Sequence, residues 1–395
     1  MRPLEGICIL DFSRVLAGPF ATQILAELGA EVTKVEHPHG GDESRSFEPQ
    51  LPGGESAYFF ALNRGKRSVT VNLKSAEGRA VARGLAARVD VVVENFLPGE
   101  MAKHGLDYAS LSAANPRLVY VSNTGFGQTG PYRGRNGYDT VFQALSGVMA
   151  LTGYPDAPPA KVGLPFADLT SGLWIAIAIL TSLVGRATTG RGCYVDLAMM
   201  DVQTSLLSIA AARLFALDED PQRAGTEHAG RVPSAAFECR GGLWLHISGS
   251  DQHWPAVCAA LDLNGLASDL VLATNAGRVA QRSRIMAAMR AAAAERDRAP
   301  LAEALRAAGV PAGEVNSVRE ILNDPHIRDR GMVGSFDHPV EGAFPALRNP
   351  LRFAGFEDPA IGTPPLLGAD TSAVLQGELG LNEAAVAALR AGRAI

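Results

Sequence analysis

The stretch "GICILDFSRVLAGPFATQILAELGAEVTKVE", residues 6–36, decides the fold of this chain. Its first seven residues are mostly apolar, which predicts a short buried strand. Residues 17–30 place apolar side chains at helical spacing, and residues 31–36 again have the pattern of a strand. A strand, a helix and a second strand in this order predict a parallel sheet whose strands are joined by helices.

The same alternation continues along the chain. Further strands are predicted at residues 67–73, 90–96 and 117–127, and Ser75 opens a predicted helix over residues 75–89. This series of elements predicts a doubly wound α/β domain.

The remainder of the chain is predicted to be helical first and mixed afterwards. Apolar segments at helical spacing lie at residues 138–153, 169–187 and 199–217, with a strand at 193–199. The polar stretch that follows predicts a linker. Beyond it we predict a hairpin around Gly241 and Gly242, a pair of Ala-rich helices within residues 276–309, strands from about Gly334, and two final helices.

Composition excludes several classes of protein. With 395 residues, two domains are expected, and 36 basic against 41 acidic residues give a net charge of −5, which does not suit a nucleic-acid-binding protein. The four cysteines form no Cys-x-x-Cys pair and are predicted to be buried free thiols of a reducing compartment. No secretory leader is recognised, and the apolar window 172–185 is too short to span a bilayer. We therefore expect a cytoplasmic protein that does not bind membranes.

Common catalytic motifs are missing. The first predicted helix lacks G-x-G-x-x-G, which argues against nicotinamide chemistry, and no G-x-S-x-G elbow points to a serine hydrolase. His37 and His39 lie close together in "HPHGGD", but the proline and glycines predict a loop, and no metal site is expected.

Cations recur near the ends of the early strands, at Lys34, Lys66, Arg67, Lys74 and Lys103. Ligands of open α/β sheets bind at the carboxyl ends of the strands, so one interpretation is a groove for a phosphate-rich ligand. The other interpretation is a solvated surface.

Asp168 stands directly in front of the long apolar run in "LPFADLTSGLWIAIAIL", residues 164–180. On spacing alone, it is interpreted as an N-cap of the following helix. The alternative is a nucleophile held at the start of that helix.

Seven motifs in order resemble those of the class III CoA-transferases, the family of formyl-CoA, carnitine and dicarboxylate CoA-transferases. They are "LDFSRVLAGPF", "GAEVTKVEHPHGGD", "NRGKRSVTVNLKSAEGR", "VENFLPG", "GYDTVFQALSG", "DLTSGL" and "PLLGADTSAVL". The resemblance covers essentially the whole chain, and the ordered set is far more specific than any single motif.

The resemblance implies a fold and an assembly. Members of the family have a Rossmann-like large domain built from both ends of the chain, and two chains form an interlocked-ring homodimer. The implied boundaries are a large domain over 1–217, a linker over 218–232, a small domain over 233–330 and a return to the large domain over 331–395.

The resemblance also implies the chemistry. The catalytic aspartate of the family corresponds to Asp168, which would attack an acyl-CoA and carry CoA as an aspartyl thioester, helped by helix N–H groups that keep it ionised. No permanently bound cofactor is implied; coenzyme A thioester is the substrate.

Positions of the CoA groove carry over from the family one by one. They are Leu16, Ala17, His37, Val71, Asn72, Leu73, Lys74, Asn95, Phe96, Leu97, Lys103, Asn136, Gly137, Tyr138 and Asp139. His37 stands where formyl-CoA transferase has arginine, Asn136 stands where it has lysine, and its glycine-rich loop is absent here.

These departures turn the expectation away from formyl-CoA:oxalate transfer. "AGTEHAGRVPSAAF" and "SRVLAGP" resemble succinyl-CoA-dependent transferases of glutarate, itaconate or mesaconate, with Arg14 and Arg231 as candidates for a second carboxylate. An α-methylacyl-CoA racemase is an alternative, disfavoured because Tyr138 replaces the histidine of its Gly-His-Asp motif. A non-catalytic acyl-CoA-binding protein is another.

Overall fold

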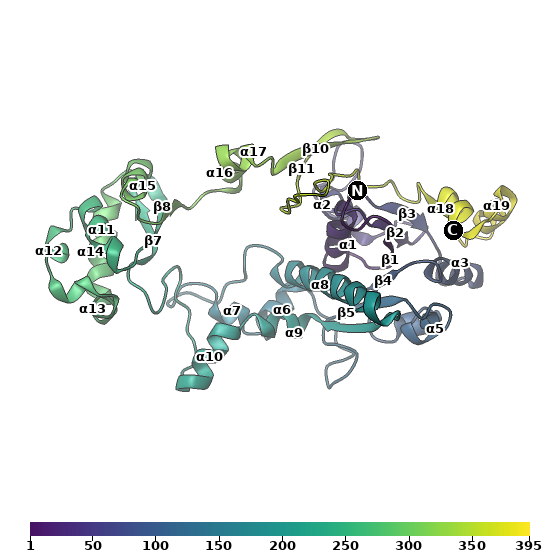
Figure 1. The fold of residues 1–395 in the computed structure, drawn as a ribbon, viewed down its shortest axis with the longest axis horizontal. Coiled ribbons are helices and arrows are strands. Elements are labelled where there is room, and N and C mark those ends of the chain that lie inside the picture. Colours follow the sequence, from purple (N-terminus) through teal and green to yellow (C-terminus); the bar gives the residue numbers. More distant parts are fainter. The chain divides into compact units, whose positions relative to one another are not determined.

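The computed structural model describes residues 1–395 and contains two compact units (Figure 1). The first unit comprises Met1–Val148, Lys161–Asp218 and His326–Ile395, and the second comprises Met149–Ala160 and Glu219–Pro325.

One segment differs from the predicted division. Residues 149–160, assigned from the sequence to the large domain, group with the second unit. The reason is local hydrogen bonding, because the Arg223 guanidinium donates to the carbonyl oxygens of Ala150, Tyr154 and Ala157.

A six-stranded parallel sheet forms the centre of the first unit, as predicted. Its strands, in spatial order, are β3 (Arg67–Thr70), β2 (Glu31–Glu36), β1 (Cys8–Asp11), β4 (Val91–Glu94), β5 (Val119–Thr124) and β6 (Tyr194–Ala198). The chain order reverses between β1 and β4. In open parallel sheets such a reversal leaves a crevice at the carboxyl ends of the strands, where ligands bind.

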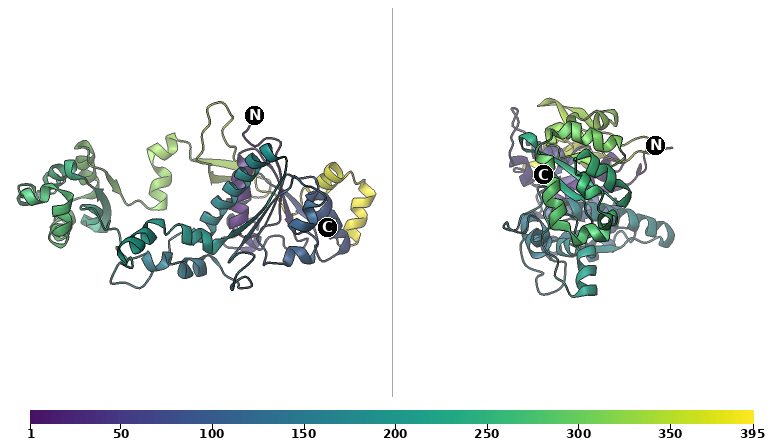
Figure 2. Two further views of the ribbon diagram at one scale, coloured as in Figure 1. Left: turned by 60° about the horizontal axis from the view of Figure 1, so that its bottom comes forward. Right: turned by 90° about the vertical axis from the view of Figure 1, so that its left-hand side faces the viewer.

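Helices cover both faces of this sheet (Figure 2). α1 (Ala17–Glu27) and α8 (Phe166–Thr189) pack on one face, and α3 (Ala76–Ala86), α18 (Thr371–Leu379) and α19 (Glu383–Ala391) pack on the other. Strand residues alternate between the two cores, with Ile9 on the α1 side and Leu10 on the α3 side. Since both faces are covered, the strands read as continuous apolar runs.

The remaining elements of the first unit are short. They are α2 (Ala57–Leu62), α4 (Glu100–Lys103), α5 (Tyr108–Ser112), α6 (Asp139–Leu145), α9 (Met199–Ser205), α10 (Ser208–Leu217) and the antiparallel pair β10 (Val333–His338) and β11 (Gly342–Leu347). Two predicted helices are each broken. The segment 138–153 splits into α6 and α7 (Val148–Leu151), and 199–217 bends by 61° between α9 and α10.

The second unit contains an antiparallel sheet and small helices. The predicted hairpin is confirmed as β7 (Ser234–Cys239) and β8 (Leu243–Ser248), with β9 (Ala312–Glu314) alongside. Three helices, α13 (Asn275–Ala280), α14 (Arg282–Ala294) and α15 (Arg298–Ala307), replace the expected Ala-rich pair. The others are α11 (Trp254–Ala260), α12 (Asn264–Ala267) and α16 (Val318–Asn323). α17 (Pro325–Asp329) follows where the chain re-enters the first unit.

α8 is longer than the apolar window identified in the sequence. With 24 residues it is long and apolar enough to cross a membrane, by length and composition only. A core helix satisfies the same criterion, and Ile175 and Ile179 of α8 are fully buried against the sheet. The cysteines are free, but only Cys239 and Cys258 are fully buried.

Candidate active site

Asp168 lies in the first turn of α8 but does not cap it. The N-cap residue is Pro165, whose side chain accepts no hydrogen bond from the helix. The interpretation of Asp168 as an N-cap is therefore wrong. Its carboxylate is left free for another role at the helix start.

The cap of α8 is supplied by Asp139, from the first turn of α6. Its Oδ1 accepts hydrogen bonds from the N–H groups of Ala167 at 2.7 Å and Asp168 at 3.2 Å. Its Oδ2 accepts one from Nε2 of the buried Gln143 at 2.6 Å. Asp139 thus takes the helix N–H groups that the sequence had assigned to Asp168.

This arrangement changes the charge state of Asp168. Burial, and secondarily the negative charge of Asp139, raise the pKa of the Asp168 carboxyl to about 7. The expectation that the helix start keeps Asp168 ionised is therefore wrong. Because a carboxylate needs solvation or donors to hold its charge, Asp168 is poised between its two protonation states near neutral pH.

Asp168 opens onto a cavity of about 480 Å³. The cavity lies at the carboxyl ends of β1, β4, β5 and β6, where open α/β sheets bind ligands. Predicted site residues that line it are Arg14, Ala17, Asn95, Phe96, Leu97, Asn136, Gly137, Tyr138, Asp139 and Asp168.

An adjoining cavity of about 180 Å³ lies at the carboxyl ends of β2 and β3. Predicted residues that line it are Arg14, His37, Val71, Leu73, Lys74 and Phe96. Arg14 and Phe96 line both cavities, and the Arg14 guanidinium carbon lies 4.6 Å from the centre of the Phe96 ring. The two cavities therefore meet at this pair, where the strand order reverses.

The turn that carries Arg14 is held from two sides. The Asn95 side chain accepts from the Arg14 N–H at 2.9 Å and donates to the Arg14 carbonyl at 2.8 Å. The next residue, Val15, has φ of 69°, which is costly for a β-branched residue, and its N–H is bound by Asp42. Backbone strain of this kind persists only where surrounding contacts impose it, and it is common at binding sites.

Two of the predicted groove cations are not available to a ligand. The ammonium groups of Lys34 and Lys66 are fully buried, and they pair with Asp42 at 2.8 Å and Asp11 at 3.2 Å. Burial lowers the pKa of Lys66 to about 8, although Asp11 opposes this. Both lysines support the turn after β1, because their ammonium groups donate to the carbonyl oxygens of Ser13 and Pro19. The interpretation of the five cations as a phosphate groove is therefore wrong for Lys34 and Lys66.

Four predicted residues do not line either cavity. Leu16 is buried beneath the turn, the Asn72 amide donates to the Arg393 carbonyl, and Lys103 is exposed and paired with Glu100. Arg231 belongs to the second unit, where its N–H donates to the His228 carbonyl. Its role in substrate binding stays a prediction.

Several cavity residues were missed from the sequence. Glu43, Asn123, Arg135 and Met199 line the cavity of Asp168. Asn123 is almost fully buried and its Oδ1 has no hydrogen-bond partner. A signal was present, because Asn123 ends a strand of the parallel sheet, where polar side chains meet ligands.

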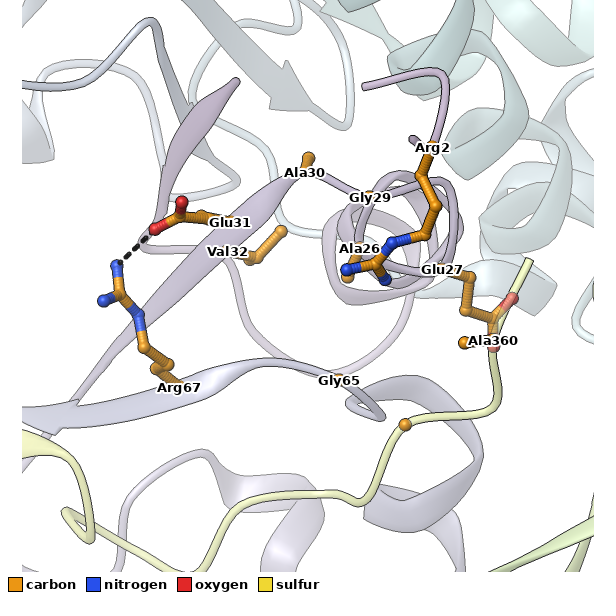
Figure 3. A pocket seen from close by; sticks show the side chains of 11 residues that line it. Arg2, Ala26, Glu27, Gly29, Ala30, Glu31, Val32, Gly65, Arg67 and Ala360 are labelled. Carbon is orange, nitrogen blue, oxygen red and sulfur yellow. Dashed lines mark ion pairs between the residues drawn. The ribbon is translucent and has the colours of Figure 1, made fainter. Parts of the chain in front are cut away.

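A third cavity, of about 220 Å³, lies at the opposite edge of the sheet, where β2 and β3 begin (Figure 3). Arg2, Glu27, Glu31 and Arg67 line it, and Arg67 pairs with Glu31 at 3.7 Å. Arg67 is one of the five cations considered for the phosphate groove, but it begins β3 and pairs with Glu31 and Glu378, so the groove interpretation is wrong for it too. No group of three or more histidine, cysteine, aspartate or glutamate side chains is placed to hold a metal ion.

Comparisons with family models, with curated proteins and with solved structures all point to one protein family. The model of CoA-transferase family III matches residues 4–371. Mouse (Mus musculus) succinyl-CoA:glutarate CoA-transferase is 37% identical over 98% of this chain and 88% of its own length. Succinyl-CoA:mesaconate CoA-transferase of Haloarcula marismortui is 39% identical over 86% of this chain and 87% of its own length. A solved structure of a CAIB/BAIF family protein from Brucella suis is 39% identical, with a TM-score of 0.86 over 95% of this chain and 99% of that one.

Proposed function

The chain belongs to CoA-transferase family III, and from this premise we propose that it moves CoA from succinyl-CoA to a small dicarboxylic acid such as glutarate, itaconate or mesaconate. The names of the two relatives above support both the donor and the class of acceptor. The observation that carries the mechanism is the free Asp168 carboxylate at the wall of a cavity on the carboxyl edge of the sheet.

The reaction follows from the chemistry of that carboxylate. Ionised Asp168 attacks the thioester carbonyl, the C–S bond breaks, and CoA leaves as a thiolate, which gives a mixed acyl anhydride on Asp168. The thiolate then attacks the Asp168 carbonyl and expels succinate, leaving an aspartyl-CoA thioester. The acceptor carboxylate enters by the same steps in reverse, so thioester energy is conserved and no ATP is consumed.

The oxyanions formed in these steps need donors. The first N–H groups of α1 have no acceptor inside the helix, and its N-cap residue Leu16 has no side-chain oxygen to occupy them. Ala17, the first residue of α1, lines the cavity of Asp168. We assign the start of α1 to oxyanion stabilisation, a contribution that typically amounts to about 3 kcal/mol per donor.

The two cavities divide the substrate between them. The cavity of Asp168 holds the reacting acyl group, and the adjoining cavity of His37 and Lys74 holds part of CoA. Arg14 stands where they meet and is placed to contact a phosphate. We further propose a cytoplasmic location, which the four free cysteines support. The resemblance of its motifs to those of family members supports an interlocked homodimer without a resident cofactor.

The test is peptide mass spectrometry after incubation with succinyl-CoA and a panel of other acyl-CoAs. We expect CoA on the peptide that contains Asp168, and loss of this adduct in Asp168→Asn, which keeps the shape of the side chain. Adduct formation only with bulky or monocarboxylic acyl-CoAs would exclude succinyl-CoA as donor. Absence of any adduct, with CoA binding retained, would favour the acyl-CoA-binding protein.

A further inference from the structure

Two positively charged side chains line the cavity of Asp168, namely Arg14 and Arg135. Three carboxylates, Glu43, Asp139 and Asp168, line the same cavity. A dicarboxylate that enters it brings further negative charge toward a nucleophile that must itself be ionised. Binding therefore requires a cation aimed at the distal carboxylate, because an unpaired charge in such a site is costly.

Arg135 is held in place without a carboxylate partner. Its guanidinium carbon lies 3.7 Å from the centre of the Tyr132 ring, and no ion pair or side-chain hydrogen bond involves it. The ring of Tyr132 packs edge-on against Phe126, which in turn packs on the fully buried Phe142, itself a wall of the cavity. Stacking of this kind fixes the plane of a guanidinium and leaves its N–H groups free for a carboxylate.

The stacked side chains Arg135, Tyr132, Phe126 and Phe142 pack against the backbone of the site through Phe142. A Cβ atom at Gly137 would lie 2.5 Å from Phe142, and one at Gly125 would lie 2.6 Å from it. Both glycines line the cavity. Glycine at these two positions lets the main chain close around Phe142, which sets the platform on which Arg135 rests.

Arg14 is placed for a different task. It lies where the two cavities meet and stacks on Phe96, so it faces the CoA side of the site as well as the acyl side. Arg135 lines only the cavity of Asp168. Their positions therefore assign Arg14 to CoA and Arg135 to the acid.

From this geometry we propose that Arg135, stacked on Tyr132, binds the distal carboxylate of the dicarboxylic acid and so determines acid specificity. The inference rests on the proposed function. Because donor and acceptor acids occupy the site in turn, one guanidinium serves succinate as it leaves and glutarate as it enters.

The experiment isolates the second half-reaction. Enzyme is first loaded with CoA on Asp168, with loading followed to completion by mass spectrometry. Glutarate or pentanoate is then added, and the rate of loss of the adduct is measured. These two acids share a five-carbon chain and differ only at the distal end. The variants are Arg135→Ala, Arg135→Lys and the control Arg133→Ala, an exposed arginine of the same loop that lines neither cavity.

We expect Arg135→Ala to slow the reaction with glutarate by roughly 10- to 100-fold, the usual effect of losing a hydrogen bond to a charged group. The rate with pentanoate should change by less than about twofold on the same grounds. Arg135→Lys should be intermediate, since it keeps the charge but loses the planar fork. Arg133→Ala should match the unaltered protein.

Two negative results are distinguishable. If the unaltered protein never loads CoA on Asp168, the proposed function fails. Suppose instead that the unaltered protein loads CoA normally. The role of Arg135 alone is then overturned if glutarate removes CoA from Arg135→Ala as fast as from the unaltered protein. It is also overturned if pentanoate removes CoA from the unaltered protein faster than glutarate does.

Discussion

The proposed role of Asp168 as nucleophile and the environment of its carboxyl group oppose each other. Attack requires the ionised carboxylate, but burial and the charge of Asp139 raise its pKa to about 7. We therefore expect kcat/KM to rise with pH and to level off above an apparent pKa near 7, because this parameter reports ionisation in the free enzyme. Steady-state rates between pH 5 and pH 9 check this.

Asp139→Asn tests the second cause of the shift. An asparagine oxygen still accepts hydrogen bonds from Ala167 and Asp168, but the negative charge is gone. We expect the rising limb of the profile to move below pH 7. Asp201→Asn, which changes an exposed carboxylate on α9, is the control. An unmoved limb in Asp139→Asn would mean that burial alone sets the pKa.

The same pKa predicts a cost in stability. A carboxyl whose pKa is raised in the folded state favours folding below its unfolded pKa, and this advantage is lost as pH rises through about 7. Asp168→Asn carries no such group, so it should unfold at a higher temperature than the unaltered protein at pH 8. The gain should be at most about 4 kcal/mol and shrink toward pH 4. Thermal unfolding at both pH values measures it, and a gain that does not depend on pH would contradict this cause.

Single residues also mark where sequence reasoning succeeds. Asp168, Asn95 and Tyr138 were identified through ordered motifs, and they do line one cavity. For Lys34 and Lys66 the sequence left a ligand groove and a solvated surface open, and both lysines are instead buried against Asp42 and Asp11. A position at the end of a strand does not by itself show whether a side chain faces a ligand or is buried in the core. A lysine there faces either ligand or core, depending on a carboxylate that can be 55 residues distant, as Asp11 is from Lys66.

At the scale of elements, the site depends on the contact between α1 and α8. Both helices begin at the cavity, and at Gly172 they pack so tightly that a Cβ atom would lie 2.7 Å from the Ala17 carbonyl oxygen. We expect Gly172→Ala to destabilise the fold by about 1–3 kcal/mol, because backbone must move to admit the methyl group. It should also slow CoA transfer, since the start of α1 is displaced from Asp168.

Gly185→Ala is the matched control on the same helix. No atom lies within 4 Å of a Cβ built there, so the better helix propensity of alanine should stabilise the fold by about 0.5–1 kcal/mol. Denaturant unfolding of both variants gives the two free energies. If both substitutions change the free energy of unfolding in the same direction, the close packing of α1 on α8 does not restrict the side chain at Gly172.

Elements were predicted well where period and caps agree. The strands of the sheet read as continuous apolar runs, and Ser75 does cap α3 through the Gly78 N–H. The breaks at α6–α7 and α9–α10 were missed, because both halves keep helical spacing and the bend lacks a proline. The cap of α8 was misassigned because the acceptor of its N–H groups, Asp139, lies on another helix, a tertiary contact that local spacing does not encode.

For the whole molecule, exposed apolar side chains bear on its assembly. Large apolar side chains are exposed along the first unit, including Trp174 and Val184 on α8 and Ile209 and Phe215 on α10, with Phe215 84% exposed. Exposed apolar side chains that gather on one face usually mark an interface between proteins. We predict a homodimer, and sedimentation that shows only monomer would contradict it.

Interlocking makes a sharper prediction than dimerisation. The chain leaves the first unit at Asp218 and returns to it at His326, so each protomer closes a loop through its second unit. If two such loops are linked, protomers separate only when a unit unfolds, and exchange is then limited by unfolding rather than by dilution. Tagged and untagged dimers mixed under native conditions should give no mixed dimer by native mass spectrometry over days, whereas unfolding and refolding them together should. Mixed dimers that appear within minutes of native mixing would mean a dimer whose rings are not linked.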